Sequence, residues 1–397
     1  MATAPVSAGA APLAHPFDTG PFARVQERLR LGRLERPRVV RRAIILAAIA
    51  WLPLLILAAI EGLALGATPR ESLLLDVSAY ARYLVALPAL VFAEVACLPR
   101  LAGIARHFGE SGLISDADRA RYDAVIASSA QLLDWRWVAW LLVLVAYVWT
   151  VLMTQVLYPA ELSTWVARIT DGGRALSLAG WWRLLVSQPL FLVLAVAWLW
   201  RAAVWGRFVW KVSRLDLQLV PAHPDLAGGL SFVSGSLGAF ALVSLAIGVT
   251  LAGSVAESIF IDRAMPSEFR AVPVFAVVVV LILFAAPLLV FGRALRSSRR
   301  RGMHAYGELA AAVGQRFERR WLGRRERVDD EALGVPDFSA TTDLYAIATN
   351  VRNMRSVVID VRSLIPLVAT SLLPFVLVVV LAIPTKELLE LVARLVM

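Results

Sequence analysis

The chain has 397 residues, of which 59% are hydrophobic and 18% charged, with a net charge of +10 and a mean hydropathy of +0.70. Soluble domains are closer to half apolar and a quarter charged, and they lack long apolar runs between blocks of charge. The composition therefore excludes an ordinary soluble protein. A basic chain also raises nucleic-acid binding, but the arginines flank the apolar runs as membrane orientation requires, so we expect no nucleic-acid partner.

The apolar runs predict an all-α fold, a polytopic helical membrane protein with about seven transmembrane helices. Residues 1–20 are rich in Ala and Pro and predict a disordered tail without a cleavable signal peptide, followed by a basic cytoplasmic segment at 21–42. About 30 Å of hydrocarbon requires roughly 20 helical residues, and in lipid only a helix pairs its own backbone. The expected spans are 43–65, 80–98, 137–157, 182–204, 232–255, 272–291 and 364–383. Helices 1–6 thus lie within 43–292 and helix 7 within 363–384.

The distribution of arginine predicts the orientation in the membrane. Eight Arg precede the first span, Arg70 stands alone in the next loop, and later loops continue to alternate until fourteen Arg occupy 293–362. Cationic loops remain in the cytoplasm. We therefore expect a bacterial inner-membrane protein with a cytoplasmic N-terminus, a periplasmic C-terminus and membrane lipid as its surroundings.

Two cytoplasmic segments predict helical hairpins. Residues 99–134 extend the second span, turn at Gly109–Gly112 and return, with Ser115 and Asp118 suggesting a capping box. Residues 293–362 extend the sixth span as an amphipathic helix, turn near 328–336 and return through a helix at 341–355. This helix carries an apolar stripe that must be buried against the hairpin or another subunit: Met303, Tyr306, Ala310, Val313, Phe317 and Trp321. Residues 385–397 predict an interfacial helix on the outer surface.

The stretch from Ser213 to Leu230 is the most distinctive motif. It reads Ser-Arg-Leu-Asp-Leu-Gln-Leu-Val-Pro-Ala-His-Pro-Asp-Leu-Ala-Gly-Gly-Leu. It resembles a run in an uncharacterised family of proteobacterial multi-spanning membrane proteins, which shares the Ser-Arg-Leu-Asp-Leu start and the His-Pro-Asp-x-Ala-Gly-Gly-Leu core. The likeness extends from the first span to the C-terminus and is strongest over 180–240. It implies a membrane architecture and no activity, because none is assigned to that family.

The residues of this motif have two interpretations. Asp225 is placed to cap the fifth span by accepting backbone N–H groups, and Pro224 restricts His223 to an extended conformation. Alternatively, His223, Asp225, Asp216 and Arg214 form a ligand or gating site. Two ligands, His223 and Asp225, are too few for a closed metal site, so we expect neither a metal nor a cofactor.

Four charged residues lie within or beside the spans, where an unpaired charge is costly. Glu61 and Arg82 lie near the outer ends of consecutive antiparallel spans, which predicts an ion pair. Glu94 lies toward the inner end of the second span, and Glu257 lies near the outer interface. The candidate partners of Glu94 are Arg201, Arg207 and Arg214. None of these groups lies at mid-membrane, which disfavours a proton-coupled carrier.

Two further groups of residues remain open. The fifth span begins with small residues that suit either close helix packing or a pore: Ser234, Gly235, Gly238, Ala239, Ala241 and Ser244. The arginines at 293–362 exceed what orientation requires, so an anion or anionic lipid is expected at this face. The basic residues concerned include Arg299, Arg300, Arg301, Arg319 and Arg320.

These patterns support three hypotheses for function. The first is a homo-oligomeric channel or transporter for ions or small solutes, anions among them, and the second is a non-transporting scaffold or sensor that binds a cytoplasmic partner or anionic lipid. The third is an integral-membrane enzyme that uses the His223 and Asp225 loop. The sequence has no P-loop, dinucleotide glycine motif or His-Glu-x-x-His, which disfavours an enzyme. A continuous polar path across the spans would separate the first hypothesis from the second.

Overall fold

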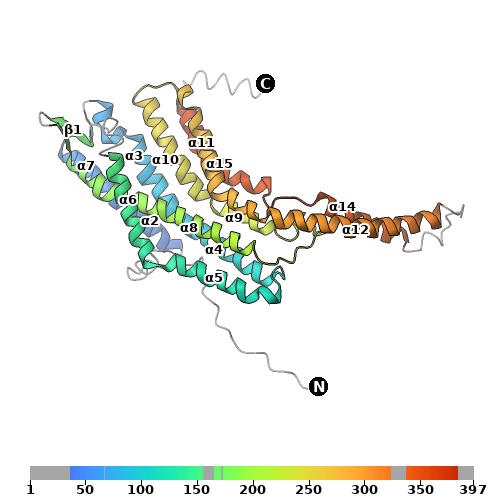
Figure 1. Cartoon of the computed structure of the whole chain (residues 1–397). Helices are drawn as coiled ribbons and strands as arrows, with labels where there is room; N and C mark the ends of the chain where they lie inside the picture. The colour runs from blue at the N-terminus through green and yellow to red at the C-terminus, as the bar shows by residue number, and fades with distance from the viewer. Residues whose placement is uncertain (1–35, 67, 155–164, 171–172, 323–336, 383–397) are drawn as a thin grey trace, which may run out of the picture.

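The computed structural model describes residues 36–66, 68–154, 165–170, 173–322 and 337–382, and it confirms an all-α fold (Figure 1). The described strands form one hairpin, β1 (Ala167–Thr170) with β2 (Gly173–Leu176), paired antiparallel with Ala167 opposite Leu176. Several predicted segments lie outside the described residues: the tail at 1–20, most of the basic segment at 21–42, the turn at 328–336 and the interfacial helix at 385–397.

Six helices of the described chain are long and apolar enough to cross a membrane, or seven if α5 and α6 form one bent span. The first crossing is α2 (Arg36–Ile60), and the third is α6 (Arg136–Leu152). The second begins as α3 (Val77–Tyr80) and continues through a π-helical segment at Ala81–Ala86 into α4 (Leu87–Glu110). The fourth begins as α7 (Leu178–Trp182) and continues through a π-helical segment at Arg183–Ser187 into α8 (Gln188–Val212). The others are α10 (Ala241–Phe260), α11 (Ala271–Val280) and α15 (Val361–Ala382). The expected span count agrees with this range.

The third span begins as predicted, within one residue, and is preceded by a separate helix. Its helix α6 ends at Leu152 instead of residue 157, where the last predicted residues lie outside the described chain. Helix α5 (Arg119–Asp134) precedes it with a bend of 49°. The hydroxyl of Tyr122 and the ring of Phe208 show why α5 stays close to the bundle: Tyr122 donates to the Ala105 carbonyl, and its ring lies 6.4 Å from that of Phe208.

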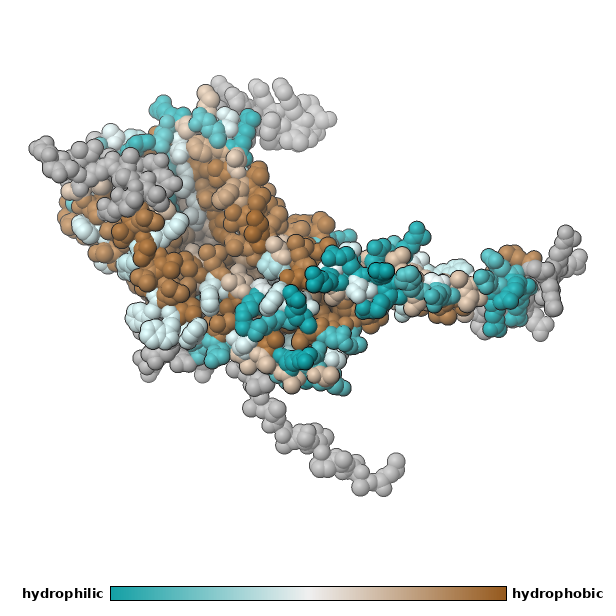
Figure 2. Space-filling view, in the orientation of Figure 1, coloured by the Kyte–Doolittle hydropathy of each residue, from teal (hydrophilic) through white to brown (hydrophobic). Residues whose placement is uncertain are grey.

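The outer surface of the bundle is apolar, as lipid contact requires. On α2, Ile44, Leu52 and Ile56 are more than half exposed, whereas Ala50 and Leu54 on the opposite face are completely buried. Figure 2 shows this apolar surface over the spans and hydrophilic residues gathered on α12 and at the adjoining end of the bundle. Exposed apolar area of this extent is stable only against lipid or another protein.

The helices run alternately in opposite directions and define two ends. At one end, Arg70 Nη2 lies 2.7 Å from Asp262 Oδ1, which joins the loop after α2 to the loop after α10. At the other, which we call the arm end, Gln218 N donates to Leu113 O at 2.9 Å. The alternation agrees with the antiparallel order expected from the sequence.

An aromatic cluster packs the core at the arm end. The ring of Phe108 on α4 lies 4.9 Å from Phe232, 6.3 Å from Phe208 on α8, and 6.1 Å from Phe291, which directly precedes α12. These rings are buried or half-buried. Aromatic pairs at such separations stabilise beyond their buried area, so the cluster unites the ends of three crossings.

The sixth span continues directly into α12 (Gly292–Trp321), which packs against α14 (Asp337–Asn353). We call this helical pair the arm, and Figure 1 shows it projecting sideways from the bundle. The chain bends where a π-helical segment (Leu281–Ala285) and a 3₁₀ segment (Ala286–Phe291) replace regular α-helix. Such departures from α geometry are common causes of bends.

The apolar stripe of α12 is covered mainly by its own hairpin partner. The rings of Phe317 and Trp321 each lie 5.0 Å from Phe338 of α14. A Cβ at Gly314 would lie 2.5 Å from Tyr345 Oη, so the helices approach closely there. Met303 remains exposed. The stripe was expected to be buried against the hairpin or against another subunit. In the structure, most of it packs against the hairpin.

The orientation of the two ends leads to a labelling prediction. In a Cys97→Ala background, Ser267→Cys and Ala311→Cys place single exposed thiols at opposite ends of the molecule. Because cationic loops stay inside, a membrane-impermeant maleimide should label Ser267→Cys in spheroplasts, and Ala311→Cys only after the membrane is disrupted. The reverse pattern would show that the predicted orientation is wrong.

Candidate functional site

Three spans meet at a buried ion triad formed by Arg42 of α2, Glu94 of α4 and Arg201 of α8. Glu94 Oε1 accepts from Arg201 Nη2 at 2.9 Å, and Glu94 Oε2 accepts from Arg42 Nη2. The three side chains are only 5–8% exposed. With two guanidinium groups and one carboxylate, the triad carries a net charge of +1.

The triad lies near the arm end of the hydrocarbon layer. At 1.5 Å per residue, the helix from Ile60 back to Arg42 is roughly 27 Å long, and the helix from Leu178 to Arg201 is roughly 34 Å long. These lengths are comparable to a hydrocarbon thickness of about 30 Å. The charges therefore lie at a membrane boundary, in agreement with the position expected for Glu94.

The Arg201 guanidinium is fixed by its neighbours, but one of its N–H donors has no hydrogen-bond partner. Its central carbon lies 4.8 Å from the centroid of the Trp198 ring, and the Trp198 indole donates to the Leu90 carbonyl at 2.9 Å. The Nε atom of Arg201 is buried without a hydrogen-bond partner. A buried donor without a partner is costly, so the triad retains one unused hydrogen-bonding direction.

The structure selects one of the three predicted partners of Glu94 and adds another. Arg201 binds Glu94, whereas Arg207 donates to Ser128 Oγ at 3.3 Å and Arg214 lies over the Trp210 ring. Sequence reasoning missed Arg42, which it treated only as an orientation signal. The helical periodicity of α2 could have identified Arg42, because this residue lies on the same buried face as Val39, Ala43, Ala50 and Leu54.

The expected Glu61–Arg82 ion pair is replaced by other contacts among the described residues. Arg82 donates to the Ser78 hydroxyl and, at 3.5 Å, to Ser254 Oγ of α10. Glu61 Oε2 accepts from the backbone N–H of Leu178 at 2.8 Å, at the start of α7. Similar depth did not make the two side chains partners, because they face different neighbours. Glu257 is half-buried in the last turns of α10.

Asp225 organises the motif between α8 and α9, which we call the 213–230 loop. Its Oδ1 atom accepts from the N–H groups of Ala227 at 2.8 Å and Gly229 at 3.1 Å, and Oδ2 accepts from Ser231 at 3.1 Å. His223 Nδ1 lies 2.8 Å from Oδ1. Burial acts to raise the pKa of Asp225, but these hydrogen bonds outweigh it and hold the pKa below its usual value.

Asp225 caps a different element from the expected one. Ser231 begins the 3₁₀ turn Ser231–Ser234, which leads into α9 (Gly235–Ala239), and α10 begins only after a break at Phe240. The carboxylate thus holds the loop and the turn, and the fifth span starts farther along the chain. Left-handed backbone at Leu226 and Gly228, with φ of 56° and 65°, lets the loop fold around the carboxylate.

The 213–230 loop joins both predicted hairpins. On one side, Asp118 Oδ2 accepts from Asp216 N at 2.8 Å, and this bond, with a smaller contribution from Arg121, holds the pKa of Asp118 below its usual value against the effect of burial. On the other side, Arg355 N, just beyond α14, donates to Leu226 O at 2.7 Å. The loop therefore links the α4–α5 turn to the base of the arm through hydrogen bonds on both of its sides.

These contacts correct the predicted capping box and place the side chain of Asp216. Ser115 and Asp118 form no side-chain cap, because the Asp118 carboxylate reaches across to the loop. The Asp216 side chain is exposed and its closest described contact is Gln218 Nε2 at 3.4 Å, so its backbone makes the anchoring contact. Within the described ranges, no three His, Cys, Asp or Glu side chains are grouped so that they could hold a metal ion.

Two cationic cavities lie where the arm leaves the bundle. The first, of about 480 Å³ between α8 and α12, is lined by Trp210, Ser213, Arg214, Leu289, Val290, Arg293, Ala294, Arg296 and Ser297. The second, of about 360 Å³ beside α12, is lined by Arg296, Arg299, Arg300, Met303, His304 and Ser356. Arg296 borders both cavities.

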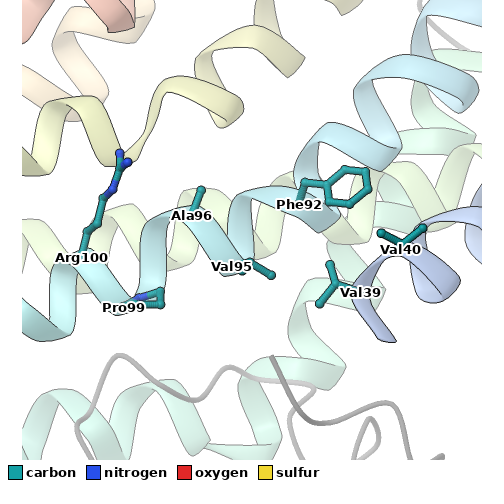
Figure 3. Close-up of a pocket in the computed structure, with 7 residues that line it drawn as sticks. All are labelled: Val39, Val40, Phe92, Val95, Ala96, Pro99 and Arg100. Carbon is teal, nitrogen blue, oxygen red and sulfur yellow. The ribbon is translucent and has the colours of Figure 1, made fainter. Parts of the chain in front are cut away.

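A third cavity, of about 540 Å³, lies between α2 and α4 and is largely apolar (Figure 3). Val39 and Val40 face Phe92 across it, while Arg100 extends away toward α9 and donates to Gly238 O at 3.3 Å. Its location among apolar spans and its lining suit a lipid acyl chain. No acid–base or nucleophilic pair lines it.

The other predicted basic residues are dispersed along the arm. Arg299 donates to Arg352 O at 2.8 Å, Arg301 to Ser297 Oγ at 2.7 Å and Arg319 to Gln315 O at 3.2 Å. Arg320 lies 5.2 Å from the Trp321 ring centroid. Arg299 and Arg301 support the arm and its base, while Arg319 and Arg320 lie near its tip, away from the two cavities.

Together the helices and their apolar surfaces define an all-α membrane protein with six to seven membrane-crossing helices. Comparisons with protein-family models, curated proteins and solved structures found no match to the chain. The family resemblance of the 213–230 motif therefore stays a hypothesis.

The ion triad predicts an asymmetric response to substitution. Glu94→Gln leaves two buried guanidiniums without a carboxylate, and breaking such a pair costs about 3–5 kcal/mol of unfolding free energy. Arg201→Gln leaves a neutral Arg42–Glu94 pair and should cost less. Thermal unfolding of the purified protein in detergent should therefore give the lowest midpoint for Glu94→Gln.

Glu110→Gln is the control for this series, because Glu110 lies exposed on the same helix, α4. Its midpoint should match that of the wild type. Equal losses for Glu94→Gln and Arg201→Gln would contradict the assigned charge balance.

The 213–230 loop should depend on the Asp225 carboxylate and not on that of Asp216. Asp225→Asn removes one acceptor oxygen, so hydrogen exchange at residues 226–231 should accelerate at neutral pH, while Asp216→Asn should leave it unchanged. The pKa of Asp225 is lowered below its unfolded value of about 3.9. Its stabilising contribution is then fully present above that pH and is lost as the pH falls through the folded pKa. Wild-type exchange protection that disappears already between neutral pH and pH ~5 would contradict this assignment.

Proposed function

We propose that the protein is a non-transporting membrane scaffold or sensor whose cationic arm lies along the cytoplasmic surface of a bacterial inner membrane and engages anionic headgroups. The observation that carries the proposal is a division of polar groups. Charged side chains buried in the described bundle are held by other groups of the chain, whereas arginines without carboxylate partners gather at the arm end. The positive charge of these arginines indicates an anionic ligand.

The charged groups buried in the described chain support this division. Besides the ion triad they are Asp76 and Asp118. Asp76 accepts from Ala79 N at 2.7 Å and from the Trp165 indole at 2.9 Å at the end opposite the arm, and Asp118 holds the 213–230 loop. These groups are separated along the bundle and do not form a succession of charged sites that an ion would follow.

Most buried hydroxyls of the described chain also donate to carbonyls, although that of Ser298 has no partner. Ser187 donates to the Ala50 carbonyl and Ser244 to the Leu367 carbonyl, each at 2.7 Å, which joins α8 to α2 and α10 to α15. Thr150 donates within α6 to Ala146 O. A hydroxyl that already donates to a carbonyl has less capacity to replace the hydration of a passing ion.

The small residues of the fifth span favour packing over a pore. A Cβ at Gly248 would overlap the backbone of Ser371 on α15, so these two helices lie at close contact. Ser244 bonds across the same contact, and the Gly238 carbonyl accepts from Arg100. The apolar stripe and part of the small-residue face are thus used for packing within one chain, whereas a Cβ at Gly235 or Gly238 would meet no atom within 4 Å.

The arm has the charge and direction that membrane-surface binding requires. It leaves the bundle sideways, and its surface is strongly hydrophilic (Figures 1 and 2). Polybasic segments next to a membrane gain about 1 kcal/mol per Lys or Arg from anionic lipid. The 213–230 loop connects the arm base to the α4–α5 turn, so a change at the arm would reach the bundle through Asp225 and Asp118.

A homo-oligomeric channel or transporter is the second candidate, and the ion triad favours it. A net charge of +1 with an unused Arg201 Nε would attract an anion. Exposed apolar residues on α6 and α15, such as Trp140 and Leu381, would allow copies to pack side by side, and the path would then run between subunits. The enzyme hypothesis is weaker, because the Asp225 carboxylate is occupied by the loop.

Flux measurements separate the two candidates. Purified protein in liposomes should give halide and potassium fluxes equal to those of protein-free liposomes, because the buried charges among the described residues are separated along the bundle. Flux that depends on protein and changes with Arg201→Gln would refute the scaffold or sensor proposal and support the channel.

The same preparation provides a positive readout for surface binding. Hydrogen exchange of α12 and α14 should slow in nanodiscs that contain anionic phosphatidylglycerol compared with neutral phosphatidylcholine. Replacing Arg300 and Arg301 by Gln should reduce the difference, and raised salt should do the same. Identical exchange in both lipids would count against an arm that engages headgroups.

A further inference from the structure

The cavity between α8 and α12 brings together arginines from two segments that are far apart in sequence. Arg214 follows the end of α8, whereas Arg293 and Arg296 lie in the first turns of α12. The Arg214 guanidinium lies 5.2 Å from the Trp210 ring centroid, which restrains it at the cavity wall. The fold, and not the local sequence, thus concentrates three positive charges on one space.

These three guanidiniums have no carboxylate partner among the described residues, and no acidic side chain lines the cavity. By contrast, Arg42, Arg70, Arg121 and Arg201 each pair with an acid. Three like charges around one cavity repel one another unless an anion neutralises them. Because the cavity supplies no anion of its own, these exposed arginines would attract an external one.

The polar lining suits a tetrahedral oxyanion. Ser297 Oγ accepts from Arg301 at 2.7 Å, which leaves its hydroxyl hydrogen available to an anion in the cavity. Arginine presents a planar fork of donors that matches phosphate oxygens in pairs. A volume of about 480 Å³ exceeds the need of a halide ion and accommodates a phosphate with part of the group that carries it.

The position of the cavity connects it to the arm. Leu289 and Val290, on its apolar side, belong to the 3₁₀ segment at which the sixth span bends into α12. An anion bound by both Arg214 and Arg296 would link the end of α8 to the beginning of the arm across that bend.

We propose that the α8–α12 cavity is a phosphate-binding site whose ligands are Arg214, Arg293 and Arg296, assisted by the Ser297 hydroxyl. The inference deepens the proposed function and rests on it, because it identifies the anionic group that the arm end recognises. The phosphate is carried either by a lipid headgroup, with its acyl chains along Leu289 and Val290, or by a small soluble molecule. Both sources present the same tetrahedral anion to the arginines.

Binding to the full-length, delipidated protein in detergent tests the site. One arm of the experiment titrates phosphatidylglycerol and counts retained lipid by native mass spectrometry; the other measures radiolabelled inorganic phosphate by equilibrium dialysis. Arg296→Gln and Arg214→Gln should each weaken binding about tenfold or more, because each removes a charge-assisted contact. Arg270→Gln, which removes one exposed arginine at the end opposite the arm, should leave binding unchanged.

The outcomes distinguish the two sources and the two proposals. Retention of lipid without binding of phosphate assigns the site to a headgroup, whereas binding of phosphate alone assigns it to a soluble molecule. Both results support the site if Arg296→Gln weakens binding about tenfold or more with an unchanged unfolding midpoint. Absence of both, or binding equally sensitive to Arg270→Gln, overturns the site. In that case slowed exchange of the arm on anionic nanodiscs would still support the surface-binding scaffold, and flux in liposomes would refute that scaffold independently.

Discussion

The contact on which the bundle most depends is the pairing of one carboxylate, Glu94, with two guanidiniums from different helices. A charge within a membrane protein is tolerated only when it is paired, so Arg42 and Arg201 hold α2 and α8 against α4 at one depth. The depth matters as much as the pairing. At the arm end of the hydrocarbon layer, the triad fixes the helices where they enter the polar region, and the apolar lengths beyond it are free to contact lipid.

The 213–230 loop extends that arrangement outside the bundle. Asp225 folds the loop around itself, the Asp216 backbone anchors it to Asp118, and Leu226 anchors the segment after α14. A motif that resembles a signature of a membrane-protein family thus acts as a structural connection between two helical hairpins. This explains its residue types without catalysis: an acid for backbone N–H groups, glycines for left-handed turns, and a proline packed beside Gly302 at the arm base.

The distribution of charge separates the interior from the exterior of the molecule. Inside the described bundle, each buried carboxylate joins two or more segments of the chain, and most buried hydroxyls donate to backbone carbonyls. Outside, at the bend between the sixth span and the arm, Arg214, Arg293 and Arg296 face a common cavity without an acid. An anionic membrane surface and a bound phosphate would both be attracted by these arginines. The membrane surface would act on the arm as a whole, and the phosphate would act at the cavity where the arm begins.

The sequence by itself determined the membrane class, the approximate spans, their alternating direction and the helical extension of the sixth span. Apolar length and helical periodicity are local properties, so no knowledge of neighbours was needed. Only the tertiary structure decided the partners: Arg42 for Glu94, Asp118 for Asp216, α14 for the stripe around Phe317, and separate contacts for Glu61 and Arg82. Partner choice depends on how each helix is rotated and offset against another that is distant in sequence, and residue pattern along one helix does not encode that offset. For the same reason, the sequence assigned Arg214 to the 213–230 motif and counted Arg293 and Arg296 among the basic residues of the arm, and only the fold brought the three to one cavity.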